Sequence, residues 1–263
     1  GTHPYGRPTI GYTSDIEALT LDDCRAFYRR RYAPDQAIIT VSGDIDSSRL
    51  LSAIEAAYGD MPAGGFPASP PLELHPSSVD PFEVEQPLSG ERLLMAYGIP
   101  AATTIDAMTI EVLNELLVEG DSSRLTRALI TDGELASSQY GFPSMLREGG
   151  LLEFGVDLRA GRKAEEAEAV ILKTIEAVAG GCVEQAELDR ALNKLELTAY
   201  RELQTAHQRA QSLGYWQVTA DDFRWCFDVD ARLRQVTLGH LQEVAQRILS
   251  PELRTVVYGR IAP

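Results

Sequence analysis

The sequence is poor in the residues that build covalent or metal-centred frameworks. It has three cysteines in 263 residues, Cys24, Cys182 and Cys226, which are too widely spaced for a disulfide scaffold or a Cys-x-x-Cys metal site. No apolar run reaches the roughly 18 residues that a membrane-spanning helix needs. Excess positive charge is also lacking, because the formal net charge is −15 at pH 7. These shortages argue against a disulfide-rich module, a membrane span and a nucleic-acid or anionic-membrane partner.

Histidine is scarce as well, and catalytic motifs are missing. The four histidines, His3, His75, His207 and His240, have no other histidine or carboxylate at a metal-binding spacing. There is no His-Glu-x-x-His, no His-x-x-Glu-His, no Gly-x-Ser-x-Gly and no Walker loop. The run of residues 120–123 is too short to cradle a phosphate and is expected to cap a helix. On its residues alone, the chain predicts no catalytic group and no metal ligand of its own.

The hydrophobic pattern that is present predicts an α+β fold. Apolar alternation indicates strands at 82–85 and 92–98, a hairpin pair at 135–146 and 151–158, and a last strand at 254–258. Helical spacing predicts helices in the following ranges: 20–31, 46–58, 105–116, 122–130, 167–178, 184–199, 206–218, 221–235 and 238–249.

One stretch near the start of the chain recurs at its far end. Residues 19–43 and 236–259 align at an offset of 217 residues, without a gap until their closing glycines. The matched residues are Thr20 with Thr237, Leu21 with Leu238, Arg30 with Arg247, Pro34 with Pro251 and Asp35 with Glu252. Each copy is expected to form a helix, a proline-marked turn and a buried strand, which puts a strand at 37–41. Cys24 lies on the apolar side of the first helix and is expected to be a buried thiol. The alternative is that helix, proline and strand recur by chance.

Two copies of one closing unit indicate two copies of one domain. The second copy closes a domain of about 180 residues, whereas only 18 residues precede the first copy, and the chain begins at Gly1 rather than Met. We therefore expect residues 1–61 to be the C-terminal remnant of a truncated first domain. Residues 62–79, rich in proline and glycine, are expected to form a linker, and 80–263 a complete second domain.

Three stretches together resemble one protein family. They are 3–11 (His-Pro-Tyr-Gly-Arg-Pro-Thr-Ile-Gly), 19–44, and 119–136, which includes Glu-Gly-Asp-Ser-Ser-Arg-Leu. In collinear order they resemble the pitrilysin/insulinase-type zinc metallopeptidases, a group that includes the mitochondrial processing peptidase subunits. The resemblance implies tandem-duplicated α+β domains, each an antiparallel-rich sheet packed by helices, that enclose a peptide-binding chamber. It also implies that zinc belongs to the first domain, upstream of residue 3, so none is expected in this chain.

The resemblance implies a substrate-contacting pair that this chain lacks. The second domain of the family often carries an arginine and, seven residues later, a tyrosine that reach the substrate. Anchored on Leu135-Ala136, those positions hold Ile130 and Ser137. Arg124, Arg127 and Tyr140 are close by in the sequence and are the candidate substrate-binding residues.

Two functions therefore compete. In the first, the chain is the C-terminal part of a zinc endopeptidase, is inactive alone and completes the peptide chamber. In the second, it belongs to an inactive family member that binds or scaffolds beside an active partner. Either way the resemblance implies peptide or unfolded-polypeptide substrates and pairing with an identical or related subunit. Relatives of bacterial type occur in the periplasm or the cytoplasm, so the compartment stays open. A third reading is an unrelated α+β domain with an accidental repeat.

Overall fold

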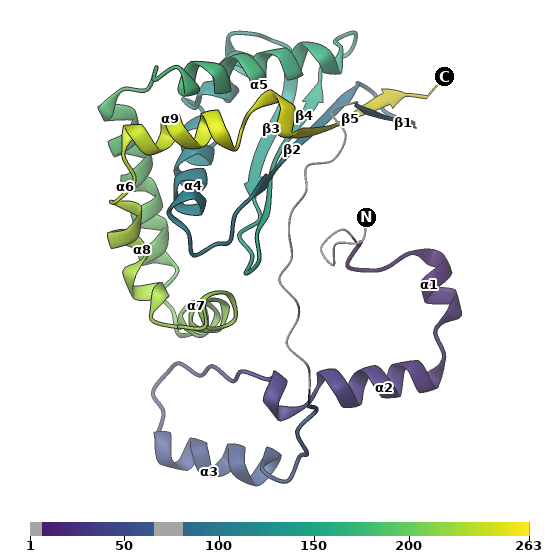
Figure 1. The fold of residues 1–263 in the computed structure, drawn as a ribbon, viewed down its shortest axis with the longest axis vertical. Coiled ribbons are helices and arrows are strands. Elements are labelled where there is room, and N and C mark those ends of the chain that lie inside the picture. Colours follow the sequence, from purple (N-terminus) through teal and green to yellow (C-terminus); the bar gives the residue numbers. More distant parts are fainter. Residues whose placement is uncertain (1–6, 66–80, 263) are drawn as a thin grey trace.

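The computed structural model describes residues 7–65 and 81–262. The N-terminal stretch contains α1 (Thr13–Ala18), α2 (Leu21–Arg31), a short 3-10 helix (Pro34–Gln36) and α3 (Ser47–Tyr58). All the strands of the described ranges lie in 81–262 (Figure 1). Most of the predicted linker lies outside the described residues. None of the helices within these ranges is both long and apolar enough to cross a membrane.

Residues 81–262 form a five-stranded mixed sheet. Its strands are β1 (Phe82–Gln86), β2 (Arg92–Ile99), β3 (Ala136–Pro143), β4 (Gly150–Leu158) and β5 (Arg254–Ile261). The spatial order is β1-β5-β2-β4-β3, and only the β1–β5 pair is parallel. The last strand is thus inserted between the first two. The predicted α+β class with an antiparallel-rich sheet is confirmed, as are the predicted strands at 82–85, 92–98 and 254–258 and the hairpin.

Helices cover one face of this sheet. The inner layer contains α4 (Ile105–Leu117) and α5 (Ala164–Ala179), which contact strands, and α9 (Leu238–Arg247), which lies beside both (Figure 1). Outside them lie α6 (Gln185–Arg201), α7 (Ala206–Ala220) and α8 (Trp225–Leu233). The side chains of β2 and β4 that point toward the helices alternate along each strand and are almost fully buried: Leu93, Met95, Tyr97, Ile99, Leu152 and Phe154. Burial of this inward face supplies the main stabilisation of the fold.

Of the three elements of the internal repeat, the helix and the turn occur in both copies. Thr20 and Thr237 both close a capping box at the start of their helices, α2 and α9. Pro34 and Pro251 then begin 3-10 helices of three residues each. The same local signals therefore build the same helix and turn at both ends of the chain.

The third element of the repeat was predicted wrongly. Residues 254–261 form β5, with β1 on one side and β2 on the other, whereas residues 37–42 have no strand structure. A strand exists through its hydrogen-bonded neighbours, and no described strand lies beside residues 37–42. Apolar composition alone was therefore insufficient to make a strand there.

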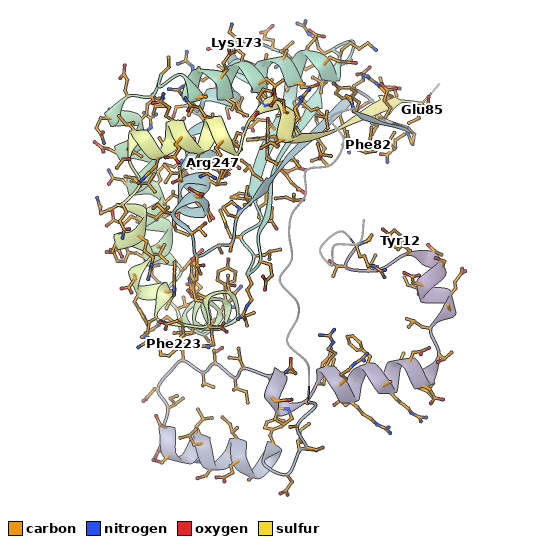
Figure 2. All side chains as sticks on the ribbon, viewed as in Figure 1. Tyr12, Phe82, Glu85, Lys173, Phe223 and Arg247 are labelled. Atoms are coloured by element: carbon orange, nitrogen blue, oxygen red, sulfur yellow. The ribbon has the colours of Figure 1, made fainter. Side chains whose placement is uncertain are left out.

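The expected buried thiol at Cys24 was also wrong, because that side chain is exposed. The apolar faces of α2 and α3 carry no packing from the rest of the described chain, and neither helix contains a buried residue (Figure 2).

Hydrogen bonds join the turn after α2 to the segment after α3. Asp35 accepts them from the backbone N–H groups of Gly64 and Gly65 at 2.9 and 3.0 Å. Gly64 is required there, because an added Cβ would lie 2.8 Å from the Cβ of Ala33.

Ion pairs fasten the parallel edge of the sheet to the helix layer. The Arg260 guanidinium of β5 contacts Glu83 at 2.7 Å, Glu91 at 2.7 Å and Glu165 at 2.6 Å. Burial alone would raise the pKa of Glu91, but Lys163, the Ala164 N–H and Arg260 hold it below its ordinary value. Removing Arg260 would therefore leave a buried carboxylate without one of its partners.

Candidate functional site

The other face of the sheet is open and is the candidate functional surface. The strand register aligns residues in rows across this face. One row runs Tyr140–Gly155–Leu94–Val257–Phe82 and the next runs Ser138–Asp157–Arg92–Gly259–Val84. Large apolar side chains on this face and at its rim are exposed: Phe82, Val84, Tyr140, Phe142, Leu151 and Ile261. A contiguous exposed apolar face of this kind marks an interaction surface.

Tyr140 is the central feature of this open face. It is 52% exposed and lies across Gly155 of the neighbouring strand. A Cβ added to Gly155 would lie 2.0 Å from Cε1 of Tyr140 and 2.7 Å from its hydroxyl oxygen. Only glycine leaves room for the ring to lie on the backbone, which explains the glycine inside a central strand. The ring is therefore held against the sheet and offers its outer surface to a ligand.

A shallow pocket of about 320 Å³ lies beside Tyr140. Arg92 lines it and pairs through Nε with Asp157 at 2.6 Å. The Ser138 hydroxyl donates a hydrogen bond of 2.8 Å to the other oxygen of Asp157. The pocket thus combines an aromatic ring, a fixed cation and apolar strand residues. Such a mixture suits an extended peptide, because polar groups set its register while alternate side chains rest on apolar surface.

Two of the three residues named from the sequence lie elsewhere. The Arg124 guanidinium forms a fork with Glu187, with Nε 3.1 Å and Nη2 2.7 Å from its two carboxylate oxygens. Hydrogen bonding from Arg124 holds the pKa of Glu187 below its ordinary value. Arg127 pairs with Asp132 at 3.0 Å. Neither arginine lines the pocket beside Tyr140, so the structure does not bring the three residues together.

The two positions that the family pattern pointed to are structural here. Ile130 packs against the hydrophobic core. Ser137 lies at the β-bulge between Ala136 and Ser138, and its hydroxyl donates a hydrogen bond to the backbone oxygen of Asp157.

The sequence analysis did not identify two residues of the open face, Arg92 and Asp157. Alternation in their strands could place each on the solvent face, but only the register of β2, β4 and β3 makes them neighbours of Tyr140.

The described residues hold no metal-binding constellation. Within 7–65 and 81–262, no group of three or more His, Cys, Asp or Glu side chains is placed to bind a metal ion. On the open face, Arg92 and Asp157 form an ion pair with each other. The side chains of this face can therefore bind a polypeptide through apolar contacts and charge.

Comparison with known proteins agrees with this fold. Residues 18–195 match the family described as the Peptidase M16 inactive domain, so the chain belongs to this family. An uncharacterized zinc protease of Mycobacterium leprae is 24% identical over 269 residues, which cover 100% of this chain and 59% of that protein. The zinc protease PqqE of Helicobacter pylori is 27% identical over 192 residues, covering 72% of this chain and 43% of that protein.

A solved structure shows the same fold. The peptidase M16 inactive domain from Pseudomonas fluorescens superposes with a TM-score of 0.87 at 19% identity, covering 100% of this chain and 62% of that one. The chain is thus a member of the Peptidase M16 inactive domain family through residues 18–195, as its resemblance to the pitrilysin/insulinase-type enzymes indicated. It spans less than two thirds of the length of the curated relatives above.

Proposed function

We propose that this chain is the C-terminal, non-catalytic part of a zinc-dependent endopeptidase and that its open sheet face lines the chamber in which a peptide is held. The observation that carries the proposal is the exposed apolar face around Tyr140, in a chain that belongs to a peptidase family. Arg92 and Asp157 beside it supply charges that orient the peptide backbone. Catalytic zinc and its ligands belong to a domain other than this one.

The same proposal assigns the domains. Residues 1–61 complete the zinc-type domain, 62–79 form the linker, and 80–263 form the non-catalytic domain. Two features support this division. The hydrophobic core cluster is drawn from residue 93 onward, and the apolar faces of α2 and α3 have no cover within the described ranges. Exposed faces of this size require another surface, which the zinc-type domain would supply. A second subunit, identical or related, would close the chamber.

The test uses the full-length protein encoded by the complete gene, loaded with zinc, and an unfolded polypeptide as substrate. We expect hydrolysis that a chelator abolishes. We expect Tyr140→Ala to raise KM roughly tenfold, the effect of losing one aromatic contact worth about 1.4 kcal/mol, with a smaller change in kcat. Lys173→Ala, an exposed residue on the helix-covered side, is the matched control and should leave KM unchanged.

Two results would contradict the proposal in different ways. A zinc-loaded protein that binds the polypeptide but does not cleave it would favour the scaffold function. Normal cleavage with an unchanged KM in Tyr140→Ala would keep the peptidase and reject the role of the open face.

A further inference from the structure

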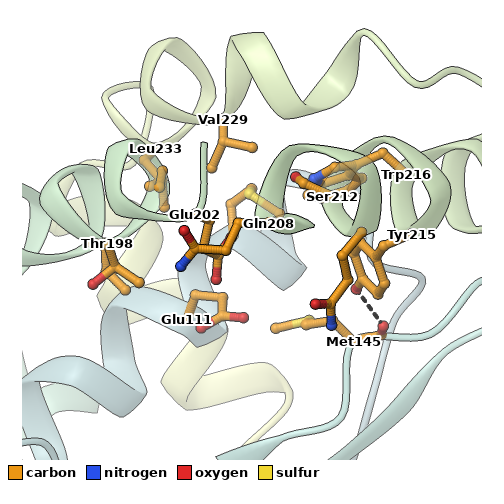
Figure 3. Close-up of a pocket in the computed structure, with 14 residues that line it drawn as sticks. Glu111, Met145, Thr198, Glu202, Gln208, Ser212, Tyr215, Trp216, Val229 and Leu233 are labelled. Atoms are coloured by element: carbon orange, nitrogen blue, oxygen red, sulfur yellow. Dashed lines mark hydrogen bonds between the residues drawn. The ribbon is translucent and has the colours of Figure 1, made fainter. Parts of the chain in front are cut away.

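A second pocket lies on the opposite side of the molecule from the open sheet face. It has a volume of about 490 Å³ and is formed by α4, α6, α7 and α8 (Figure 3). Its only charged lining residues among the described ones are Glu111 of α4 and Glu202 at the end of α6. Figure 3 shows both side chains in the middle of the pocket, and the charge of Glu202 repels that of Glu111. The pocket is therefore acidic at its centre.

Glu111 is unusual among the carboxylates of these helices. One turn along α4, Glu115 pairs with Lys194, and on α6 Glu187 pairs with Arg124 and Glu196 with Arg234. Glu111 forms no hydrogen bond or ion pair with any residue in the described part of the chain, although its side chain is only partly exposed to solvent. A poorly solvated carboxylate without a partner is costly, so a cationic ligand in the pocket would be favoured by Glu111 in its ionised form.

The electrostatics of the pocket also favour a cationic ligand. Burial, and then repulsion from Glu202, Glu115 and Glu119, raise the pKa of Glu111 to about 7. Burial also raises the pKa of Glu202. The lining groups from α7 include Tyr215 and neutral amides, those from α8 are apolar, and none carries positive charge. A bound cation would relieve the repulsion between the carboxylates.

The remaining walls combine apolar and aromatic side chains with neutral polar ones. Trp216 lines the pocket and stacks on Trp225 with ring centroids 5.3 Å apart, and Arg232 lies 3.5 Å above the Trp225 ring. The Tyr215 hydroxyl donates a hydrogen bond of 2.7 Å to the backbone oxygen of Met145, which fixes the rim (Figure 3). Methionine and tryptophan walls suit an alkyl stem, and an aromatic face also attracts a cation.

We infer that this pocket binds an organic cation, a guanidinium or primary ammonium on an unbranched alkyl stem. The charged end lies between Glu111 and Glu202, and the stem lies against Met108, Met145 and Trp216. The source is a free alkyl cation or the arginine or lysine side chain of a peptide. The pocket is separate from the open sheet face, and the inference does not rest on the proposed function.

The test titrates the 263-residue chain with n-butylguanidinium at pH 8, followed by calorimetry and amide chemical shifts. We expect one-to-one binding with a Kd on the order of 1 mM, because the ligand is small. The neutral isostere n-butylurea should bind at least about tenfold more weakly. Absence of binding, or equal binding of the urea, would overturn the inference.

Variants locate the cation. Glu111→Gln should weaken n-butylguanidinium binding at least about tenfold, and Glu202→Gln, at an exposed position where folding is not at risk, should weaken it about threefold or more. Glu85→Gln removes the same charge from an exposed position in β1, outside the pocket, and should change Kd less than about twofold. Unchanged affinity in Glu111→Gln and Glu202→Gln would overturn the inference.

A last comparison separates the two sources and checks the charge state. A blocked tripeptide with a central arginine is titrated beside n-butylguanidinium, with its citrulline analogue as control. Tighter binding of the arginine peptide assigns the pocket to a peptide side chain, whereas weaker binding assigns it to a free cation. Because the cation needs an ionised Glu111, affinity for either should fall roughly thirtyfold between pH 8 and pH 5.5. Affinity that does not change over this range would contradict a cation held by Glu111.

Discussion

The ring of Tyr140 rests on the backbone of Gly155, in the neighbouring strand, on the open face of the sheet. A methyl group at Gly155 would overlap the ring, since its Cβ would lie 2.0 Å from Cε1 and 2.3 Å from Cζ. The glycine thus fixes the position of Tyr140, the aromatic residue among the substrate-binding candidates named from the sequence.

Gly155→Ala is expected to displace the Tyr140 ring and to lower the free energy of unfolding by about 1–3 kcal/mol, the usual cost of forcing atoms into an occupied site. Urea unfolding measures the change. In a Tyr140→Ala background the overlap is gone, so the same substitution should be neutral or slightly stabilising. An equal loss in both backgrounds would show that the ring is not the cause.

Gly98→Ala is the matched control for this prediction. Gly98 lies on the same face, in β2, and a Cβ there would meet no atom within 4 Å. The substitution should leave stability unchanged or raise it by about 0.5 kcal/mol, because alanine loses less backbone entropy on folding.

Glu111→Gln should stabilise the ligand-free protein at pH 8 by about 1–3 kcal/mol. The pKa of Glu111 is raised to about 7 in the folded state, so the folded state favours the protonated form. The stability that protonation contributes is fully present below the ordinary pKa near 4.5 and is lost as the pH rises through 7. Urea unfolding of both proteins should therefore converge at pH 4.5 and diverge by pH 8. A variant less stable than the parent at pH 8 would contradict this.

The Arg124–Glu187 pair is expected to stabilise the fold without contributing to substrate binding. The pair is about four-fifths buried, with side-chain exposures of 22% and 23%. Arg124→Met should cost about 2 kcal/mol, since it leaves the Glu187 carboxylate with the Glu184 N–H but without its cation. Because the pKa of Glu187 is lowered, the contribution of the pair is present above the ordinary pKa near 4.5 and disappears as the pH falls below it. A changed KM at unchanged stability would instead make Arg124 a substrate contact.

The two capping threonines of the repeat should behave differently. Thr237→Ala removes a cap from α9, which contributes Leu241 and Val244 to the core, and should lower the free energy of unfolding by about 1 kcal/mol. Thr20→Ala removes the equivalent cap from α2, which has no buried residue, so the main unfolding transition should not move. Equal destabilisation by both would show that α2 is coupled to the core of residues 81–262.

Most of the fold was readable from the sequence because its signals are local. Capping threonines, prolines and the apolar spacing of α4 and α5 act within one or two turns, and the structure confirms the elements that they predicted. The strand expected at 37–41 does not form, because a strand depends on long-range pairing and not on local signals alone. Its composition is that of a strand, but pairing depends on neighbours that the described chain does not supply.

The candidate site was harder to predict because it depends on register. Tyr140 could be named from its position near the family motif, but Arg92 and Asp157 are 48 and 17 residues away in sequence. Only the pairing of β3 with β4 and of β4 with β2 brings them together. Arg124 pairs with Glu187 instead of lining the pocket beside Tyr140, and this partner, 63 residues on, is invisible to local patterns.

The most direct test of the central claim asks which face of this domain meets the polypeptide. In the full-length protein, with its metal removed by a chelator, a photoreactive benzoylphenylalanine replaces Phe142 on the open sheet face or Lys173 on the helix-covered side. We expect an unfolded polypeptide to crosslink at position 142 and not at position 173. Crosslinking at 173 alone, or equally at both positions, would contradict the assignment of the open face as the chamber wall.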